Sequence, residues 1–233
     1  MLVSGRNNVR EILKGNIKVR KAFLQNNFNE SDIILLLEKK NISTVYYDKR
    51  KLDSIINNNH QGVVLEIEDY VYSSIDDIIN KDNCTVVILD HLEDPHNLGA
   101  IVRTVEASGI DGIILPVSRS VSVNETVMKT SVGTLMNVKI CQVNNLINTI
   151  KYLKKKGFWI YGADMNGDNY SKINYSNKTC LIIGNEGKGM SRIVKEACDF
   201  IVSIPMKGKV NSLNASVAAG ILIYSIISNK EML

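Results

Sequence analysis

Short apolar runs alternate with stretches of helical spacing from residue 83 to the end of the chain. Stretches such as 98–105 and 146–153 place their apolar residues on one helix face. Continuous apolar strands that alternate with helices are typical of a parallel sheet with helices on both faces. The pattern therefore predicts a parallel-sheet α/β domain over residues 83–233. Its expected strands fall at 85–90, 112–115, 138–142, 158–163, 180–183 and 200–204.

The first part of the chain shows a shorter version of the same alternation. A helical stretch stops at Gly15, and Asn29 or Ser31 can cap a second helix. Strand-like runs lie between the helices, so residues 1–70 are predicted to form a compact α/β domain. Residues 71–82, VYSSIDDIINKD, are short, polar and acidic. We expect them to be a linker between the two domains.

Length and composition fit a globular protein of two domains. The chain has 233 residues, 45% of them hydrophobic, which is enough to bury two cores. No apolar run approaches the roughly 18 residues that a membrane-spanning helix needs. The N-terminus lacks an apolar core of the length found in secretory signals. We therefore expect a cytoplasmic protein without a membrane partner.

Cysteine and histidine spacing gives no metal-binding pattern. The sequence has no C-x-x-C pair, and its four cysteines lie beside or within apolar runs, so buried free thiols are expected. The stretch Asp90 to His96 gathers acids and histidines, but their spacing matches no ligand pattern. We predict no metal site.

The charge balance permits a nucleic-acid partner without requiring one. The net charge is +4, from 28 basic and 24 acidic residues. Between Arg6 and Lys21, six basic residues face one acid, Glu11. This cluster is either a solvated helix face or a patch that contacts phosphates.

The densest group of Gly, Asn, Ser and Glu residues falls within 179–227. An apolar run at 180–183 ends in a loop with three glycines, and a second run at 200–204 ends in the polar loop 206–214. In open parallel sheets, ligands bind at the carboxyl ends of the strands, where such loops meet. We therefore place the active site here.

The glycine-rich loop matches neither common nucleotide-binding fingerprint. A Walker loop requires Gly-Lys followed by Ser or Thr, and here Lys188 is followed by Gly189. A Rossmann loop requires G-x-G-x-x-G, whereas this loop runs G-x-x-G-x-G. Glycines do allow the backbone to approach a ligand closely. Glu186, between them, is hard to explain by packing.

Four other polar residues have both a local and a functional interpretation. Asn97 lies where a helix begins and is a candidate N-cap, as are Ser212 and Asn214 before the last helix. Arg103 lies off the apolar stripe of its helix and is free to pair with an acid or a phosphate. The last helix has a smooth face built from Ala215, Ala218, Ala219 and Gly220, which suits close packing. Another subunit is one candidate partner for this face.

Three segments together resemble the SpoU (TrmH) family of RNA ribose 2′-O-methyltransferases. They are NLGAIVR at 97–103, LIIGNEGKGM at 181–190 and IPMKGKVNSLNASVAAGI at 204–221, in the order that the family has. The first 70 residues open with SGRNNV, close with HQGVVLEI, and resemble the L30e-like RNA-binding domain of the branch that acts on ribosomal RNA. The resemblance thus covers the whole chain.

The resemblance implies a homodimer with a deep trefoil knot in a SPOUT-type domain, and S-adenosylmethionine (AdoMet) as the cofactor. The implied catalytic residues are Asn97, Arg103, Glu186, Ser212 and Asn214. Those implied to bind the cofactor are Gly184, Ile204, Met206 and Leu213. The expected RNA contacts are Arg6, Arg10, Lys18, Arg20, Lys21, Lys207 and Lys209.

The leading functional hypothesis is methylation of a guanosine ribose in 23S ribosomal RNA, free or within an assembling large subunit. The alternatives are a tRNA guanosine 2′-O-methyltransferase and an adenosine-specific resistance methyltransferase acting on ribosomal RNA. A non-catalytic RNA-binding protein is a different class. Such a protein would be free to lose the motif side chains, and all of them are present.

Overall fold

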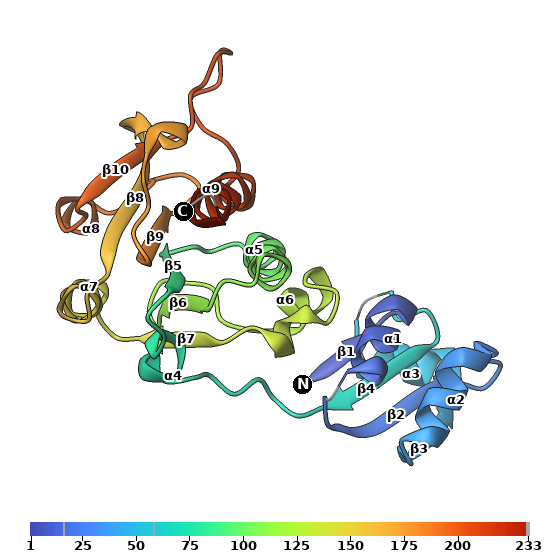
Figure 1. The fold of residues 1–233 in the computed structure, drawn as a ribbon. Coiled ribbons are helices and arrows are strands. Elements are labelled where there is room, and N and C mark those ends of the chain that lie inside the picture. Colours follow the sequence, from blue (N-terminus) through green and yellow to red (C-terminus); the bar gives the residue numbers. More distant parts are fainter. Residues whose placement is uncertain (16, 58, 232–233) are drawn as a thin grey trace. The chain divides into compact units, whose positions relative to one another are not determined.

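The computed structural model describes residues 1–15, 17–57 and 59–231, and the chain forms two compact units (Figure 1). Each unit is made of two segments of the chain. The first unit comprises 1–71 and 123–136, and the second comprises 72–122 and 137–233.

The first unit is built on a four-stranded mixed sheet in the order β1-β4-β2-β3. Strand β4 is antiparallel to both its neighbours, and β2 is parallel to β3. The prediction of an α/β domain is confirmed. Its elements are β1 (Leu2–Ser4), α1 (Arg6–Lys14), β2 (Val19–Gln25), α2 (Ser31–Lys39), β3 (Thr44–Tyr47), α3 (Lys49–Ile55) and β4 (Val63–Ile67).

The helix starts in this unit differ from the predicted ones. Helix α2 begins after Glu30 without a side-chain cap, so the prediction that Asn29 or Ser31 caps it is wrong. The Glu30 carboxylate is instead held by an ion pair with Arg6, at 2.7 Å. Helix α3 begins at Lys49, because the Asp48 side chain before it accepts a hydrogen bond from the N–H of Lys51, at 2.7 Å.

A segment from the middle of the chain completes the first unit. Helix α6 (Glu125–Thr130) is capped by the Asn124 side chain, buries Val127 and Met128, and packs on β1. A Cβ atom at Gly133 would lie 3.1 Å from the Cβ of Glu11, so the backbone passes close to α1 there. The sequence analysis placed this segment in the second domain, since short helices without a strong apolar stripe do not reveal distant packing.

The second unit is a six-stranded sheet in the order β10-β8-β9-β5-β6-β7, and every strand pair is parallel. All the predicted strands are present, and the predicted parallel α/β class is confirmed. The trefoil knot stays a prediction. The strands are β5 (Cys84–Asp90), β6 (Gly112–Pro116), β7 (Ile140–Val143), β8 (Trp159–Asn169), β9 (Lys178–Gly184) and β10 (Phe200–Ser203). The helices are α4 (Ile75–Ile79), α5 (Pro95–Ser108), α7 (Leu146–Lys155), α8 (Arg192–Glu196) and α9 (Ala215–Glu231), with short 3₁₀ turns η1 (Thr134–Asn137) and η2 (Tyr170–Lys172) along the chain.

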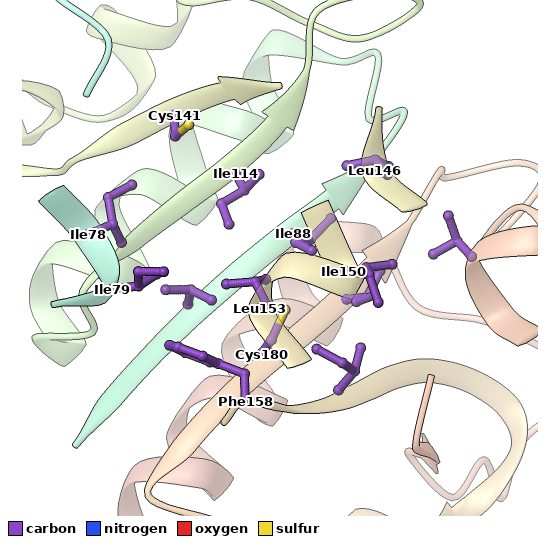
Figure 2. Close-up of a cluster of buried hydrophobic side chains, with 14 of the residues drawn as sticks. Ile78, Ile79, Ile88, Ile114, Cys141, Leu146, Ile150, Leu153, Phe158 and Cys180 are labelled. Carbon is purple, nitrogen blue, oxygen red and sulfur yellow. The ribbon is translucent and has the colours of Figure 1, made fainter. Parts of the chain in front are cut away.

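Helices cover both faces of this sheet, with α5 and α9 on one face and α4, α7 and α8 on the other (Figure 1). Figure 2 shows the second face, where Ile150 and Leu153 of α7 pack over Ile88 of β5 and Cys180 of β9. These contacts hold the central strands in place. They therefore also fix the position of the loops that follow the carboxyl ends of these strands.

Helix α4 lies within the stretch that was expected to be a linker. The Ser74 side chain accepts from the N–H of Asp77, and the Asp77 carboxylate accepts from the N–H of Ser74, which is a capping box. Ile78 and Ile79 are buried in the core of the second unit. The structure therefore differs from the expectation of an open linker, because the polar residues serve as caps.

The small residues of α9 do not form a free face. Ala215 and Ala219 are buried within their own chain, where α9 packs against α5. A Cβ atom added at Gly220 would meet nothing within 4 Å. The expectation that the whole small-residue face meets another subunit is therefore wrong for Ala215 and Ala219. No helix in the described part of the chain is long and apolar enough to cross a membrane.

The cysteine thiols are predicted to be unreactive in the folded protein. All four are free, and Cys84, Cys141 and Cys180 are buried, as expected, while Cys198 is partly buried. Burial raises the pKa of Cys84 and of Cys198 to about 12. At pH 8 their thiolate fraction is then about 1,000-fold below that of a free cysteine.

Titration with a disulfide reagent at pH 8 measures this, with the unfolded protein as the reference. The unfolded chain should titrate four thiols at once, and the native chain should react far more slowly. Rapid native reaction of Cys84 would show that its thiol is accessible and contradict the buried location.

Candidate active site

The loops that follow β9 and β10, at the carboxyl edge of the second sheet, surround a cavity of about 380 Å³. Residues of β8 and of α9 close its sides. A cavity of this size suits a small-molecule ligand. The lining residues are Ala163, Asp164, Met165, Ile183, Gly184, Asn185, Glu186, Gly187, Lys188, Gly189, Val202, Ile204, Met206, Asn211, Ser212, Leu213, Ala215, Ala218 and Leu222.

The cavity gathers most of the residues that the sequence nominated. Its lining includes all four residues expected to bind the cofactor, namely Gly184, Ile204, Met206 and Leu213. Glu186 and Ser212 line it as well, whereas Asn97, Arg103 and Asn214 do not.

Asp164 is a lining residue that the sequence analysis missed. Strand β8 was expected to end at Ala163 but continues to Asn169, which brings Asp164 to the cavity wall. Burial favours its neutral form, but the hydrogen bonds from Lys195 and from the N–H of Asn166 outweigh this effect and lower the pKa of Asp164. The cavity wall therefore carries an ionised carboxylate.

The glycine-rich loop places bare backbone against the cavity. A Cβ atom at Gly184 would lie 2.2 Å from the N of Met190, so no other residue fits there without movement. The loop closes on itself through two hydrogen bonds, from Asn185 N to Gly189 O (3.0 Å) and from Gly189 N to Asn185 O (2.9 Å). Gly189 has a φ of 67°, which favours glycine.

A chain of side-chain hydrogen bonds connects this loop with the starts of α5 and α9. Asn97 Nδ2 donates to Glu186 Oε1 (2.9 Å), and Asn214 Nδ2 donates to Asn97 Oδ1 (2.9 Å). Asn214 Oδ1 then accepts from the N–H of Ser216, at 2.9 Å. Because an ionised carboxylate only accepts and a backbone N–H only donates, both amides can be oriented in one way alone. We call Glu186, Asn97 and Asn214 the amide chain.

The hydrogen bonds around the amide chain show which of its members caps a helix. Asp94, not Asn97, caps α5, because its side chain accepts from the N–H of His96 at 2.8 Å. The N-cap interpretation of Asn97 is therefore wrong. Asn214 caps α9, which confirms its local interpretation, and it also donates to Asn97; its catalytic role stays a prediction. Ser212 lies exposed in the preceding loop, at the cavity.

Arg103 stands apart from the cavity. It is exposed on α5, and no hydrogen bond or ion pair involves its side chain among the described residues. Glu186 accepts a hydrogen bond from Asn97 and makes none with Arg103. Lys207 and Lys209 are likewise exposed, in the loop before α9, without ion pairs in the described part of the chain.

Most of the basic residues between Arg6 and Lys21 are already paired. Ion pairs join Arg6 to Glu30 (2.7 Å) and Lys18 to Glu68 (3.0 Å). Arg10 pairs with both Glu30 and Asp32, Lys21 lies 5.5 Å from the ring centre of Phe23, and Arg20 is exposed. The expected phosphate patch is therefore largely compensated by acids.

The first unit also has a cavity, of about 500 Å³. Lys49 lines it, and no ion pair of Lys49 is found among the residues described. The buried His60 ring is fixed at its wall, since Nδ1 accepts from the N–H of Gly62 (2.9 Å) and Nε2 lies 3.0 Å from Asp53. The remaining lining residues are Arg6, Gln25, Asn27, Phe28, Asn29, Asn59 and Gln61. This cavity was not predicted from the sequence, because its walls come from four separate segments, each a loop or the end of a helix.

Across residues 1–15, 17–57 and 59–231, no three His, Cys, Asp or Glu side chains gather as metal ligands would. The prediction that no metal is needed remains open to test.

Comparison with known families accounts for both units. Residues 84–224 match the model of the SpoU rRNA Methylase family, which is more than half of the chain. The chain belongs to the SpoU rRNA methylase family. Residues 2–73 match a second model, described as RNA 2'-O ribose methyltransferase substrate binding.

Relatives share this two-unit organisation. YacO of Bacillus subtilis (strain 168), named as a member of the TrmH family of tRNA/rRNA methyltransferases, is 40% identical over 98% of this chain and 96% of its own. The SpoU methyltransferase AviRb from Streptomyces viridochromogenes, solved with AdoMet, has the same fold, with a TM-score of 0.86, 23% identity and coverage of 99% of this chain and 90% of that one.

A shorter relative aligns with only part of the chain. The A. aeolicus TrmH/SpoU tRNA modifying enzyme is 30% identical with a TM-score of 0.59, and the match covers 64% of this chain and 77% of that one. The alignments of this SpoU-family chain with YacO and AviRb therefore span both units, whereas the alignment with the A. aeolicus enzyme spans only part of the chain.

The dual role of Asn214 predicts different costs for two substitutions. Asn214→Ala removes the helix cap, and we expect the free energy of unfolding to fall by about 1 kcal/mol. Asn214→Ser keeps a capping oxygen, so its loss should be about half as large or less. Urea unfolding followed by circular dichroism measures both. Equal losses in the two variants would show that the cap does not stabilise α9.

Proposed function

We propose that this SpoU-family RNA methyltransferase transfers the methyl group of AdoMet to the ribose 2′-hydroxyl of a guanosine in 23S ribosomal RNA. The observation that supports this best is the cavity at the carboxyl edge of the sheet, where the glycine loop and the amide chain meet. The cytoplasm is the proposed compartment.

The cavity fits AdoMet by size and by chemistry. Its volume lies in the range of small-molecule sites, and Ile183, Val202 and Leu222 give it apolar walls. The backbone at Gly184, Ile204 and Leu213 offers N–H and C=O groups to polar parts of the cofactor, with Met206 alongside. The carboxylate of Asp164 suits an amino or hydroxyl group. Bound AdoMet would supply an electrophilic methyl group.

The side chains around the cavity then position the RNA. An arginine guanidinium donates hydrogen bonds but has no acceptor site, so Arg103 is not proposed as the general base. Its free, planar guanidinium suits a phosphate of the RNA and an oxygen that gains negative charge. The carboxylate of Glu186 is oriented by Asn97, and the hydroxyl of Ser212 lies at the cavity for a hydrogen bond to the ribose or the cofactor.

Two observations favour ribosomal RNA over tRNA. The chain has a complete first unit, whereas the A. aeolicus enzyme, named for tRNA, aligns with 64% of the chain. The cavity of the first unit combines cations, Arg6 and Lys49, with the aromatic Phe28 and several amides. Such groups stack on and hydrogen-bond to unpaired bases of folded RNA. Exposed Arg20, Lys207 and Lys209 would add phosphate contacts.

Arg103→Ala is expected to reduce methyl transfer by about 100- to 1,000-fold while AdoMet affinity stays near the wild-type value. The reason is placement, because Arg103 does not line the cavity. Arg103→Lys should remain strongly impaired, since lysine lacks the two-pronged grip on phosphate. Single-turnover transfer of labelled methyl groups to unmodified ribosomal RNA measures the rate, and calorimetry in excess chelator measures AdoMet binding.

Near wild-type transfer by Arg103→Ala would remove this residue from the mechanism. AdoMet binding that appears only when zinc or magnesium is restored would contradict the proposed metal-free site.

We propose a homodimer that uses the outer face of α9. Val217 and Tyr224 are both 49% exposed and lie seven residues apart, on one helix face. Tyr224→Asp should yield monomers in analytical ultracentrifugation, because a buried unpaired charge opposes association. Ile193→Asp, on α8 and 65% exposed before substitution, is the control and should remain dimeric. A wild-type monomer at micromolar concentration would refute the proposal.

A further inference from the structure

Asp90 is a buried carboxylate with no part in the function proposed so far. It ends strand β5, at the centre of the sheet, and is 1% exposed. Its Oδ2 accepts from the N–H of Ser191 (2.7 Å) and from the Ser191 hydroxyl (3.0 Å). Its Oδ1 lies 2.6 Å from Nδ1 of His91. One carboxylate therefore joins the end of β5 to the residue that follows the glycine loop.

A second connection lies at the other end of the same loop. Asn185 Nδ2 donates to the backbone oxygen of His91, at 2.8 Å. His91 has a φ of 58°, a left-handed conformation that is uncommon outside glycine. Asn185 Oδ1 also accepts from the N–H groups of Gly187 and Lys188, at 3.0 and 3.2 Å. The loop from Asn185 to Ser191 is thus held at both ends by Asp90 and His91.

These connections determine where the two ends of the Glu186–Asn97 hydrogen bond lie. Glu186 follows Asn185 directly, inside the held loop. Asn97 stands in the first turn of α5, which begins five residues after Asp90 at Pro95. Both partners are therefore attached to the same short stretch of backbone at the end of β5.

We propose that Asp90 is a positioning residue for methyl transfer, which sets the glycine loop against α5 so that Glu186 and Asn97 meet at the cavity. This inference rests on the proposed function. Asp90 touches neither the cavity nor the reacting atoms; it acts through Ser191 and His91. A displacement of about 1 Å in a positioned group costs on the order of 100-fold in rate.

Two substitutions separate hydrogen bonding from mere bulk at this site. Asp90→Ala removes every acceptor and so takes away the partner of the Ser191 N–H. Asp90→Asn keeps one oxygen for Ser191, and its amide group can donate to His91 Nδ1 in the other tautomer of the ring. The asparagine variant should therefore restore most of what alanine loses.

A matched control lies beside the opposite end of β5, at Asp111, the residue before β6. Asp111, whose side chain is 10% exposed, accepts from the N–H of Thr85 (2.8 Å) and pairs with Lys81 (2.6 Å). It resembles Asp90 in burial and in bonding to backbone, yet it lies at the amino edge of the sheet. Asp111→Ala should lower stability without reaching the glycine loop.

The experiment uses the full-length chain and measures three quantities for Asp90→Ala, Asp90→Asn, Asp111→Ala and wild type. They are the single-turnover rate at saturating AdoMet with unmodified ribosomal RNA, the thermal midpoint, and hydrogen exchange of the loop 184–191. We expect about a 100-fold lower rate for Asp90→Ala, a rate within about tenfold of wild type for Asp90→Asn, and less than a threefold change for Asp111→Ala. Exchange in the loop should rise for Asp90→Ala and remain unchanged for Asp111→Ala.

Equal rates for Asp90→Ala and Asp111→Ala at similar thermal midpoints would overturn the proposal. If Asp90→Ala does not fold, Ser191→Ala replaces it, with an expected rate loss between those of the two Asp90 variants; a wild-type rate would count against the proposal. If wild type itself transfers no methyl group, the proposed function fails. The exchange data then still report whether Asp90 holds the loop.

Discussion

The site depends on one run of hydrogen bonds, from Glu186 through Asn97 to Asn214 and the first turn of α9. Asn97 lies 89 residues from Glu186 and 117 residues from Asn214 in the sequence. A carboxylate at one end and a backbone N–H at the other determine the direction of every bond between them. Asn97, the middle member, is buried, so its amide group depends on both Glu186 and Asn214 as hydrogen-bond partners, although these two side chains are themselves exposed.

The parallel sheet explains why these residues meet. Strands β5 and β9 are neighbours, so the loop before α5 and the glycine loop leave the same edge side by side. The third loop, after β10, reaches this edge through α9, which packs against α5. The helices of the opposite face bury the apolar side chains of the same central strands (Figure 2). The sheet is therefore the rigid part of the second unit. The candidate site residues lie at its carboxyl edge, as is usual for open α/β folds.

Much of this arrangement was readable from the sequence, and the failures have physical causes. The strands were found because parallel strands are continuously apolar, and the region of the cavity because Gly, Ser and Asn gather after strand ends. The individual cofactor residues came from the resemblance to the family. Residues 75–79 were missed as a helix since a capping box and a polar linker have similar composition. The place of 123–136 and the burial of Ala219 depend on packing between distant segments, which no local pattern records. The same holds for Asp90, which was considered only as a metal ligand, whereas its partner Ser191 lies about a hundred residues away.

The most direct test of the proposed activity is a map of 2′-O-methyl positions in total cellular RNA, with and without the gene. The account predicts that one guanosine of 23S ribosomal RNA loses its ribose methyl group in the deletion strain and regains it with wild-type protein, but not with Arg103→Ala. An unchanged ribosomal RNA map, or a loss confined to tRNA, would contradict it.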